Sequence, residues 1–178
     1  MLKTYFVRFA LMTCAGALLF MTTMQSESGV TAAAPANPLL EKWGGPYGGV
    51  PPFDKVKIED FKPALEAAMA ENLAEVDAIA NQKDAPTFEN TIVAMEKSGD
   101  TFNRVQTIFG VWSSNMSSKD FEPIDAEMSP KIAGHSDKIY QNEALFKRIE
   151  AVYNSPEKTK LTKEQQLDII NRTFHGAM

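Results

Sequence analysis

Apolar residues recur at helical spacing through most of the chain beyond residue 58. From Phe61 they occupy positions 61, 65, 68, 69, 73, 76 and 79, the pattern of one helix face, with acidic residues mostly opposite. Glu59 and Asp60 lie at the start, where the helix dipole favours anions, and Pro63 falls in the first turn, where proline is tolerated. The pattern predicts a helix of about twenty residues that ends before Asp84.

Two helices are expected between residues 87 and 116. Thr87 follows a proline and can cap the first of them, and Gly99 can stop it. The second begins near Thr101 and carries a wide, aromatic stripe: Phe102, Val105, Ile108, Phe109, Trp112 and Met116. A helix that is apolar over such an arc must bury itself against neighbours. We therefore interpret this stripe as core packing and not as a cofactor site.

Three further helices are predicted toward the end of the chain. One begins at Ser117 or Ser118 and continues past Ile139, and Pro130 inside it predicts a kink. Asn142 caps the next, whose apolar face is Leu145, Phe146, Ile149, Val152 and Tyr153. Thr162 and Gln165 form a capping box for the last, whose apolar face is Leu167, Ile170 and Phe174. No segment alternates like a strand, so the predicted fold class is all-α.

Residues 37–57 differ in composition from the helical region 58–178. Residues 37–53 hold four Gly and four Pro, which excludes a regular element and predicts an extended arm. Trp43, Tyr47 and Phe53 make the arm too apolar for a free linker. We expect it to lie against an apolar surface, which need not belong to this chain.

Residues 1–36 have the layout of a secretory signal peptide. Lys3 and Arg8 precede a charge-free apolar run over 9–21, which polar and then small residues follow. This run is shorter than the roughly 20 residues that a bilayer-spanning helix needs. We expect cleavage after Ala34 or Ala36 and export to the periplasm, with no stable membrane span afterwards. An uncleaved N-terminal membrane anchor is the alternative. Cleavage would remove Cys14, so no disulfide is expected.

Residues that could carry chemistry are few. A catalytic zinc needs three protein ligands, but the chain has two His, His135 and His175, forty residues apart and without an HExxH motif. His135 lies on an apolar stripe and is interpreted as a packed, hydrogen-bonded core residue, and His175 as a solvated one. The chain has no G-x-S-x-G elbow and no phosphate loop. We predict no catalytic, cofactor-binding or metal-binding residue. The net charge of −5, without basic blocks, gives no reason to expect nucleic acid as a partner.

The segment PTFENTIVAMEKSG, residues 86–99, closely resembles the thimet oligopeptidase family of zinc metallopeptidases, in its bacterial peptidyl-dipeptidase (dipeptidyl carboxypeptidase) branch. Segments 37–43, 51–80, 127–142 and 144–153 resemble that branch in the same order. The resemblance implies a two-lobed, all-helical enzyme with a deep channel, in which these helices help to roof the channel. It also implies hydrolysis of short peptides by a zinc-activated water, which releases C-terminal dipeptides.

The residues that perform this chemistry in the family have no counterpart in this chain. Its last predicted helix begins as the family's does, but the chain closes with residues 174–178 and does not continue into the enzyme. We therefore expect a truncated N-terminal peptidase region that lacks the catalytic lobe, binds no zinc and is inactive alone. The alternative is a free-standing exported helical module that binds peptides or a partner without cleaving them.

Overall fold

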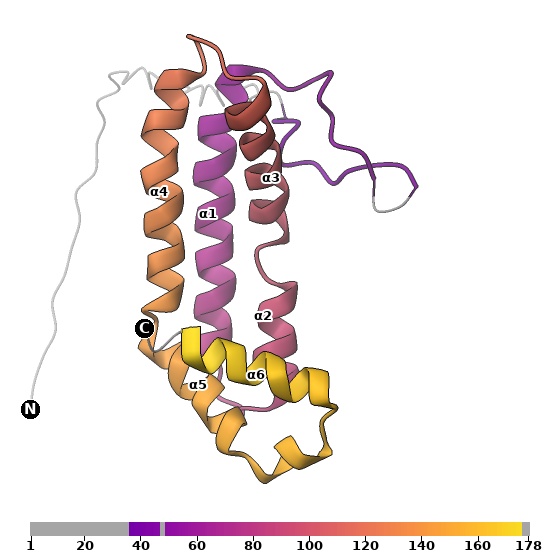
Figure 1. Cartoon of the computed structure of the whole chain (residues 1–178), viewed down its shortest axis with the longest axis vertical. Helices are drawn as coiled ribbons and strands as arrows, with labels where there is room; N and C mark the ends of the chain where they lie inside the picture. Colours follow the sequence, from indigo (N-terminus) through magenta and orange to yellow (C-terminus); the bar gives the residue numbers. More distant parts are fainter. Residues whose placement is uncertain (1–35, 47–48, 176–178) are drawn as a thin grey trace, which may run out of the picture. The chain divides into compact units, whose positions relative to one another are not determined.

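The computed structural model describes residues 36–46 and 49–175, with side chains as far as residue 171. The expected signal peptide, Tyr47 and the side chains of Phe174 and His175 lie outside these descriptions. Every regular element of the described part is a helix, which confirms the all-α prediction (Figure 1). The β-pairing found there is an isolated bridge between Gly44 and Val50.

Six α-helices and two short helices of other types follow one another in the described part of the chain. They are α1 (Ile58–Ala80), a π-helix η1 (Phe88–Val93), α2 (Ala94–Lys97), α3 (Asp100–Asn115), α4 (Glu122–Tyr140), α5 (Glu143–Asn154), a 3-10 helix η2 (Pro156–Lys160) and α6 (Lys163–His175). Figure 1 shows α3 and α4 packed along α1, while α5 and α6 lie at the C-terminal end of α1.

The predicted caps are present at three helix starts. The Thr87 hydroxyl accepts a hydrogen bond from the Asn90 amide at 3.1 Å, and the Asn142 side chain accepts one from the Leu145 amide at 3.0 Å. Thr162 and Gln165 form the reciprocal box, in which the Thr162 amide donates to Gln165 Oε1 at 2.9 Å. Local side-chain chemistry therefore sets where these three helices begin.

Two helix boundaries differ from the predictions. The fourth predicted helix begins at Glu122 and not at Ser117 or Ser118, because the Ser118 carbonyl instead closes a turn by accepting from the Phe121 and Glu122 amides, both at 2.9 Å. The helix predicted from Thr87 is a π-helix for six residues and becomes α-helical only at Ala94. α4 runs continuously across Pro130, and the kink stays a prediction.

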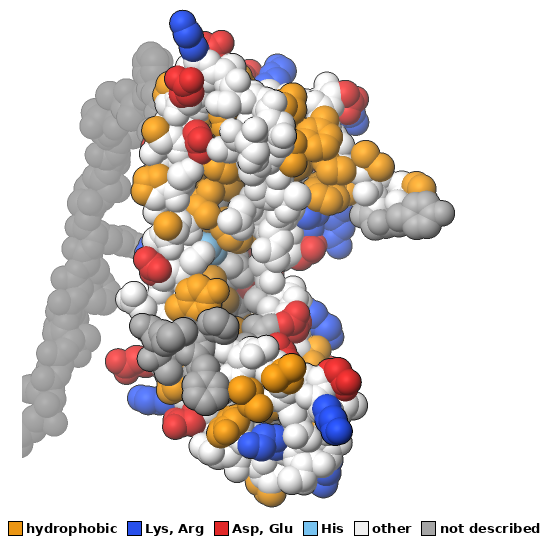
Figure 2. Space-filling view, in the orientation of Figure 1, with side chains coloured by type: hydrophobic (Ala, Val, Ile, Leu, Met, Phe, Trp, Pro, Cys, Tyr) orange, Lys and Arg blue, Asp and Glu red, His pale blue; other side chains and the backbone are white. Residues whose placement is uncertain are grey.

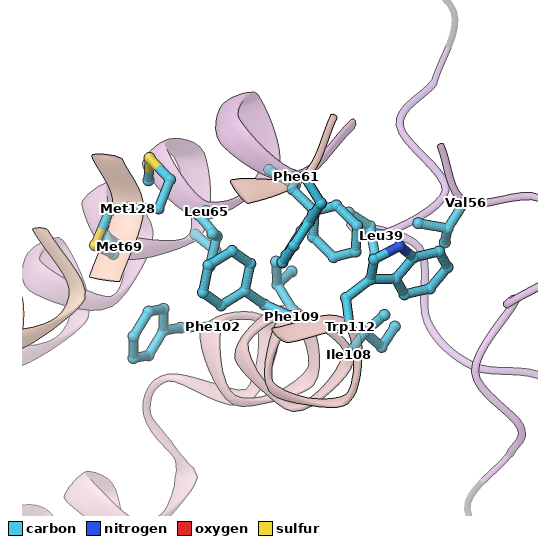
Figure 3. Close-up of a cluster of buried hydrophobic side chains, with 14 residues drawn as sticks. Leu39, Val56, Phe61, Leu65, Met69, Phe102, Ile108, Phe109, Trp112 and Met128 are labelled. Carbon is cyan, nitrogen blue, oxygen red and sulfur yellow. The ribbon is translucent and has the colours of Figure 1, made fainter. Parts of the chain in front are cut away.

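The first core cluster is aromatic and centres on Phe61 of α1 (Figure 3). The Phe61 ring is fully buried and meets Phe109, Trp112 and Phe121 edge-on, with centroid distances of 5.8, 5.1 and 5.4 Å. Edge-to-face pairs of this kind contribute about 0.5–1.5 kcal/mol each beyond the area they bury. The predicted aromatic stripe of α3 is therefore core packing, although Met116 at its end is 47% exposed.

The arm before α1 packs onto this same cluster. Leu39 is fully buried, and the Asn37 side-chain amide donates to the Asp60 carbonyl at 2.8 Å. Phe53 stacks on Trp112 of α3 with ring centroids 6.0 Å apart. The apolar surface that the arm requires is thus supplied by α1 and α3 of this chain.

The second core cluster lies at the other end of α1. It joins Val76, Ile79 and Ala80 of α1 to Ile92, Leu145, Ile149, Val152 and Ile169. Ile169 is the fully buried residue of α6, whereas Leu167, which the sequence pattern placed on the apolar face, is 57% exposed. The placement of Leu167 on the buried face was therefore wrong, because α6 packs on α5 through the side that carries Ile169.

Candidate functional site

A buried polar pair separates the two core clusters. His135 of α4 and Asn72 of α1 are 3% and 5% exposed, and His135 Nε2 lies 2.9 Å from Asn72 Oδ1. The imidazole also packs against the Phe102 ring of α3 at a centroid distance of 4.5 Å. His135 is therefore a packed, hydrogen-bonded residue that links α4 to α1, as its place on an apolar stripe suggested.

Burial decides the charge state of this histidine. It lowers the pKa of His135, and the nearby Lys138 lowers it further, so the ring is neutral at neutral pH. With the Asn72 oxygen facing Nε2, a hydrogen bond between the two requires the ring proton on Nε2 and leaves Nδ1 as an acceptor. Nδ1 is buried and has no hydrogen-bond partner among the described residues.

The turn between α2 and α3 lies directly over Asn72. Gly99 has φ +73°, and its amide donates to Glu75 Oε2 of α1 at 2.7 Å. A Cβ at this position would lie 2.8 Å from Asn72 Nδ2, closer than side chains tolerate. Only glycine therefore lets the turn descend onto Asn72 and still adopt the left-handed backbone.

A groove of about 310 Å³ opens above this pair. Its walls come from α1, the α2–α3 turn, α3 and the end of α4, and they include Asn103, Gln106, Ser136 and Tyr140. Figure 2 shows a His side chain within a recess of the surface on the face drawn there. The buried polar pair and this groove form the candidate site of the described part of the chain.

The 86–99 motif has a structural role in this fold. Asn90 Oδ1 accepts from the Thr87 amide at 2.8 Å and from the Thr91 hydroxyl at 3.0 Å, while its Nδ2 donates to the Ala85 carbonyl at 2.9 Å. The Gln82 side chain donates to the Asn90 carbonyl at 2.7 Å. One asparagine thus organises both the entry to η1 and the loop before it.

Arg148 of α5 completes this arrangement from the other side. Its side chain is buried, and Nη1 donates to the Gln82 and Asp84 carbonyls at 3.1 Å each, while Nη2 donates to Asn90 Oδ1 at 3.1 Å. The planar guanidinium can reach these acceptors at once, which a lysine ammonium cannot do. The arginine therefore holds the α1–η1 loop against α5.

The described residues do not fit a catalytic zinc. No group of three or more His, Cys, Asp or Glu side chains converges among them. The one described imidazole directs its Nε2 to Asn72 within the core, where no carboxylate accompanies it. We therefore derive no zinc chemistry from this part of the chain.

Sequence reasoning missed Asn72, Asn90 and Arg148. A signal for two of them was present, because Asn72 and Arg148 occupy positions on the apolar faces of α1 and α5, between Met69 and Val76 and between Leu145 and Val152. A polar residue inside an apolar stripe predicts a buried polar contact.

None of the described helices combines the length and the apolar character that crossing a bilayer requires.

Comparison with known proteins identifies the family. The chain is 33% identical over 140 residues to the dipeptidyl carboxypeptidase of Salmonella typhimurium and 31% identical over 140 residues to that of Escherichia coli. Each alignment covers 78% of this chain but 20% of the relative. Oligopeptidase A of Haemophilus influenzae is 25% identical over 122 residues, which are 68% of this chain and 17% of that protein. No family model matches the chain. The chain spans about a fifth of the length of these curated relatives and is a homologue of the dipeptidyl carboxypeptidases and oligopeptidase A, in the thimet oligopeptidase family.

Proposed function

We propose that this chain is the N-terminal helical region of a zinc-dependent peptidyl-dipeptidase, which removes dipeptides from the C-termini of short peptides. The observation that carries the proposal is the 33% identity to a dipeptidyl carboxypeptidase over 140 residues. The relatives are peptidases, which favours a peptidase part over a free-standing binding module.

The role of the region in such an enzyme is structural. Its two hydrophobic clusters and the bonds made by Arg148 supply a rigid helical body, while the described residues offer no set of metal ligands. The zinc site and the general base would therefore belong to the part of the enzyme that the alignments leave unmatched. We infer that residues 1–178 alone do not hydrolyse peptides.

Export to the periplasm is part of the same proposal. The charges at Lys3 and Arg8, the apolar run over 9–21 and the small residues near 34–36 support a cleaved signal peptide. Cleavage after Ala34 or Ala36 would make Pro35 or Asn37 the new N-terminus, and the Asn37 side chain is bonded to the first turn of α1.

A hybrid enzyme tests the proposal. In the Escherichia coli dipeptidyl carboxypeptidase, the region aligned with this chain is replaced by residues 37–175, and C-terminal dipeptide release from an N-blocked peptide is measured with added zinc. We expect the hybrid to be active, and both the 178-residue chain alone and the Escherichia coli enzyme with its aligned region deleted to be inactive.

Two results would contradict the proposal. Zinc-dependent turnover by the 178-residue chain alone would show that it contains a complete active site. A hybrid that is folded and zinc-loaded but inactive would show that this region cannot substitute for its relative.

A further inference from the structure

The groove above Asn72 and His135 is lined by uncharged polar side chains. The described residues along it include three amides, Asn72, Asn103 and Gln106, together with hydroxyl and apolar groups, and no Asp, Glu, Lys or Arg. Since the His135 ring is also neutral at neutral pH, none of the described side chains along the groove carries a formal charge. A ligand with a charged group there would lose water without gaining a counter-ion, which is costly.

Two of these amides are available to a ligand. Asn103 and Gln106 are exposed and stand three residues apart on α3, which places their Cβ atoms about 5–6 Å apart. Tyr140 of α4 borders the groove and is 59% exposed. The buried Val76, the partly buried Ile139 and the Phe102 ring supply apolar contact between these polar groups.

This pattern matches one kind of ligand. In an extended polypeptide, peptide groups that face the same way recur every two residues, about 6.6–6.8 Å apart. Each peptide group offers one N–H donor and one C=O acceptor, and each side-chain amide offers a C=O acceptor and an NH2 group with two donors. Two long side chains separated by about 5–6 Å can therefore pair with successive peptide groups of one strand.

We propose that this groove binds an uncharged, extended segment of polypeptide through the Asn103 and Gln106 amides. The ends of a peptide carry charge, so the groove accepts an internal segment and not a free terminus. This inference goes beyond the proposed function because it concerns binding by the helices themselves and requires neither zinc nor hydrolysis.

The test is a titration of the full chain with an end-blocked peptide, N-acetyl-Ala-Gln-Ala-Gln-Ala-amide, monitored by the NMR signals of the imidazole rings. We expect saturable shifts of the His135 ring signals, because that ring lies under the groove. The same peptide with free, charged ends is expected to bind several-fold more weakly. A double variant, Asn103→Ala with Gln106→Ala, removes two hydrogen bonds and should raise the Kd about tenfold.

Asn115→Ala is the matched control, because Asn115 is an exposed amide on the same helix that does not line the groove. Its Kd should equal that of the unaltered chain. The proposal is overturned if the His135 signals do not shift, if the control weakens binding as much as the double variant does, or if the free-ended peptide binds as tightly. Shifts that depend on protein concentration without peptide would assign the groove to a second copy and would also overturn it. None of these results depends on hydrolysis, so the proposed peptidase function can fail or stand separately.

Discussion

Replacing Gly99 with alanine should be among the most destabilising small substitutions in this chain. Gly99 has φ +73°, a conformation that costs a residue with a Cβ about 1–2 kcal/mol. The added Cβ would also lie 2.8 Å from Asn72 Nδ2 and 3.1 Å from Asn72 Cγ. Asn72 can move away only by giving up its bond to His135, which leaves buried polar groups unpaired at a cost of about 1–3 kcal/mol. We expect the free energy of unfolding to fall by about 2–5 kcal/mol.

Urea denaturation followed by far-UV circular dichroism measures this loss. Gly110→Ala and Gly134→Ala are the matched controls, because both glycines lie within helices and a Cβ there meets nothing within 4 Å. Alanine has the higher helix propensity, so each control should stabilise the chain by about 0.5–1 kcal/mol.

A double-mutant cycle identifies the cause of the loss. In an Asn72→Ala background the steric neighbour is gone, so Gly99→Ala should cost only the backbone part, about 1–2 kcal/mol. Equal costs in the two backgrounds would refute the argument that the added Cβ displaces Asn72 from His135. A cost below about 1 kcal/mol in the unaltered chain would refute the backbone argument as well.

Three further outcomes are expected. Burial lowers the pKa of His135 in the folded chain, so the unfolded chain binds a proton more readily. The contribution of His135 to stability is therefore fully present above about pH 6.5 and should be lost as the pH falls toward the lowered pKa. Urea midpoints measured against pH should fall less steeply in His135→Gln than in the unaltered chain. Arg148→Lys should lower the free energy of unfolding by about 1–3 kcal/mol in the same assay, since one ammonium cannot replace both Nη donors; an unchanged midpoint would contradict the role of Arg148 as a clamp. Hydrogen bonds from Lys131 and Lys62 lower the pKa of Glu127 to about 2. When both lysines are replaced by alanine, the pKa of Glu127 measured by NMR titration should rise toward 4.5.

The sequence predicted helices well where a side-chain cap or a long apolar stripe marks them. α1, α3 and α5 were found with their buried faces because each stripe runs for more than two turns, and Thr87, Asn142 and Thr162 marked helix starts by side-chain bonds to nearby amides. These signals are local, so one sequence is enough to reveal them.

The remaining features depend on contacts between distant segments. α6 is short, and its sequence does not show whether Ile169 or Leu167 faces α5, since that choice depends on where the second core cluster lies. The Arg148 clamp joins residues 58 to 66 positions apart in sequence. The π-helical start at residues 88–93 likewise follows no simple sequence rule. The candidate groove forms where α1, α3, α4 and the α2–α3 turn meet. The periodicity of apolar residues predicts each helix but not how the helices are arranged around one another.

The polar pair between the two hydrophobic clusters has a consequence for how the chain opens. α1 contributes buried apolar residues to both clusters. Between these two sets of residues α1 carries Asn72, whose side chain is hydrogen-bonded to His135. The chain can therefore lose α5 and α6 by fraying from one end while the aromatic half stays closed. Amide protons of α5 should then exchange with solvent faster than those of α3, with α1 showing a gradient of protection along its length.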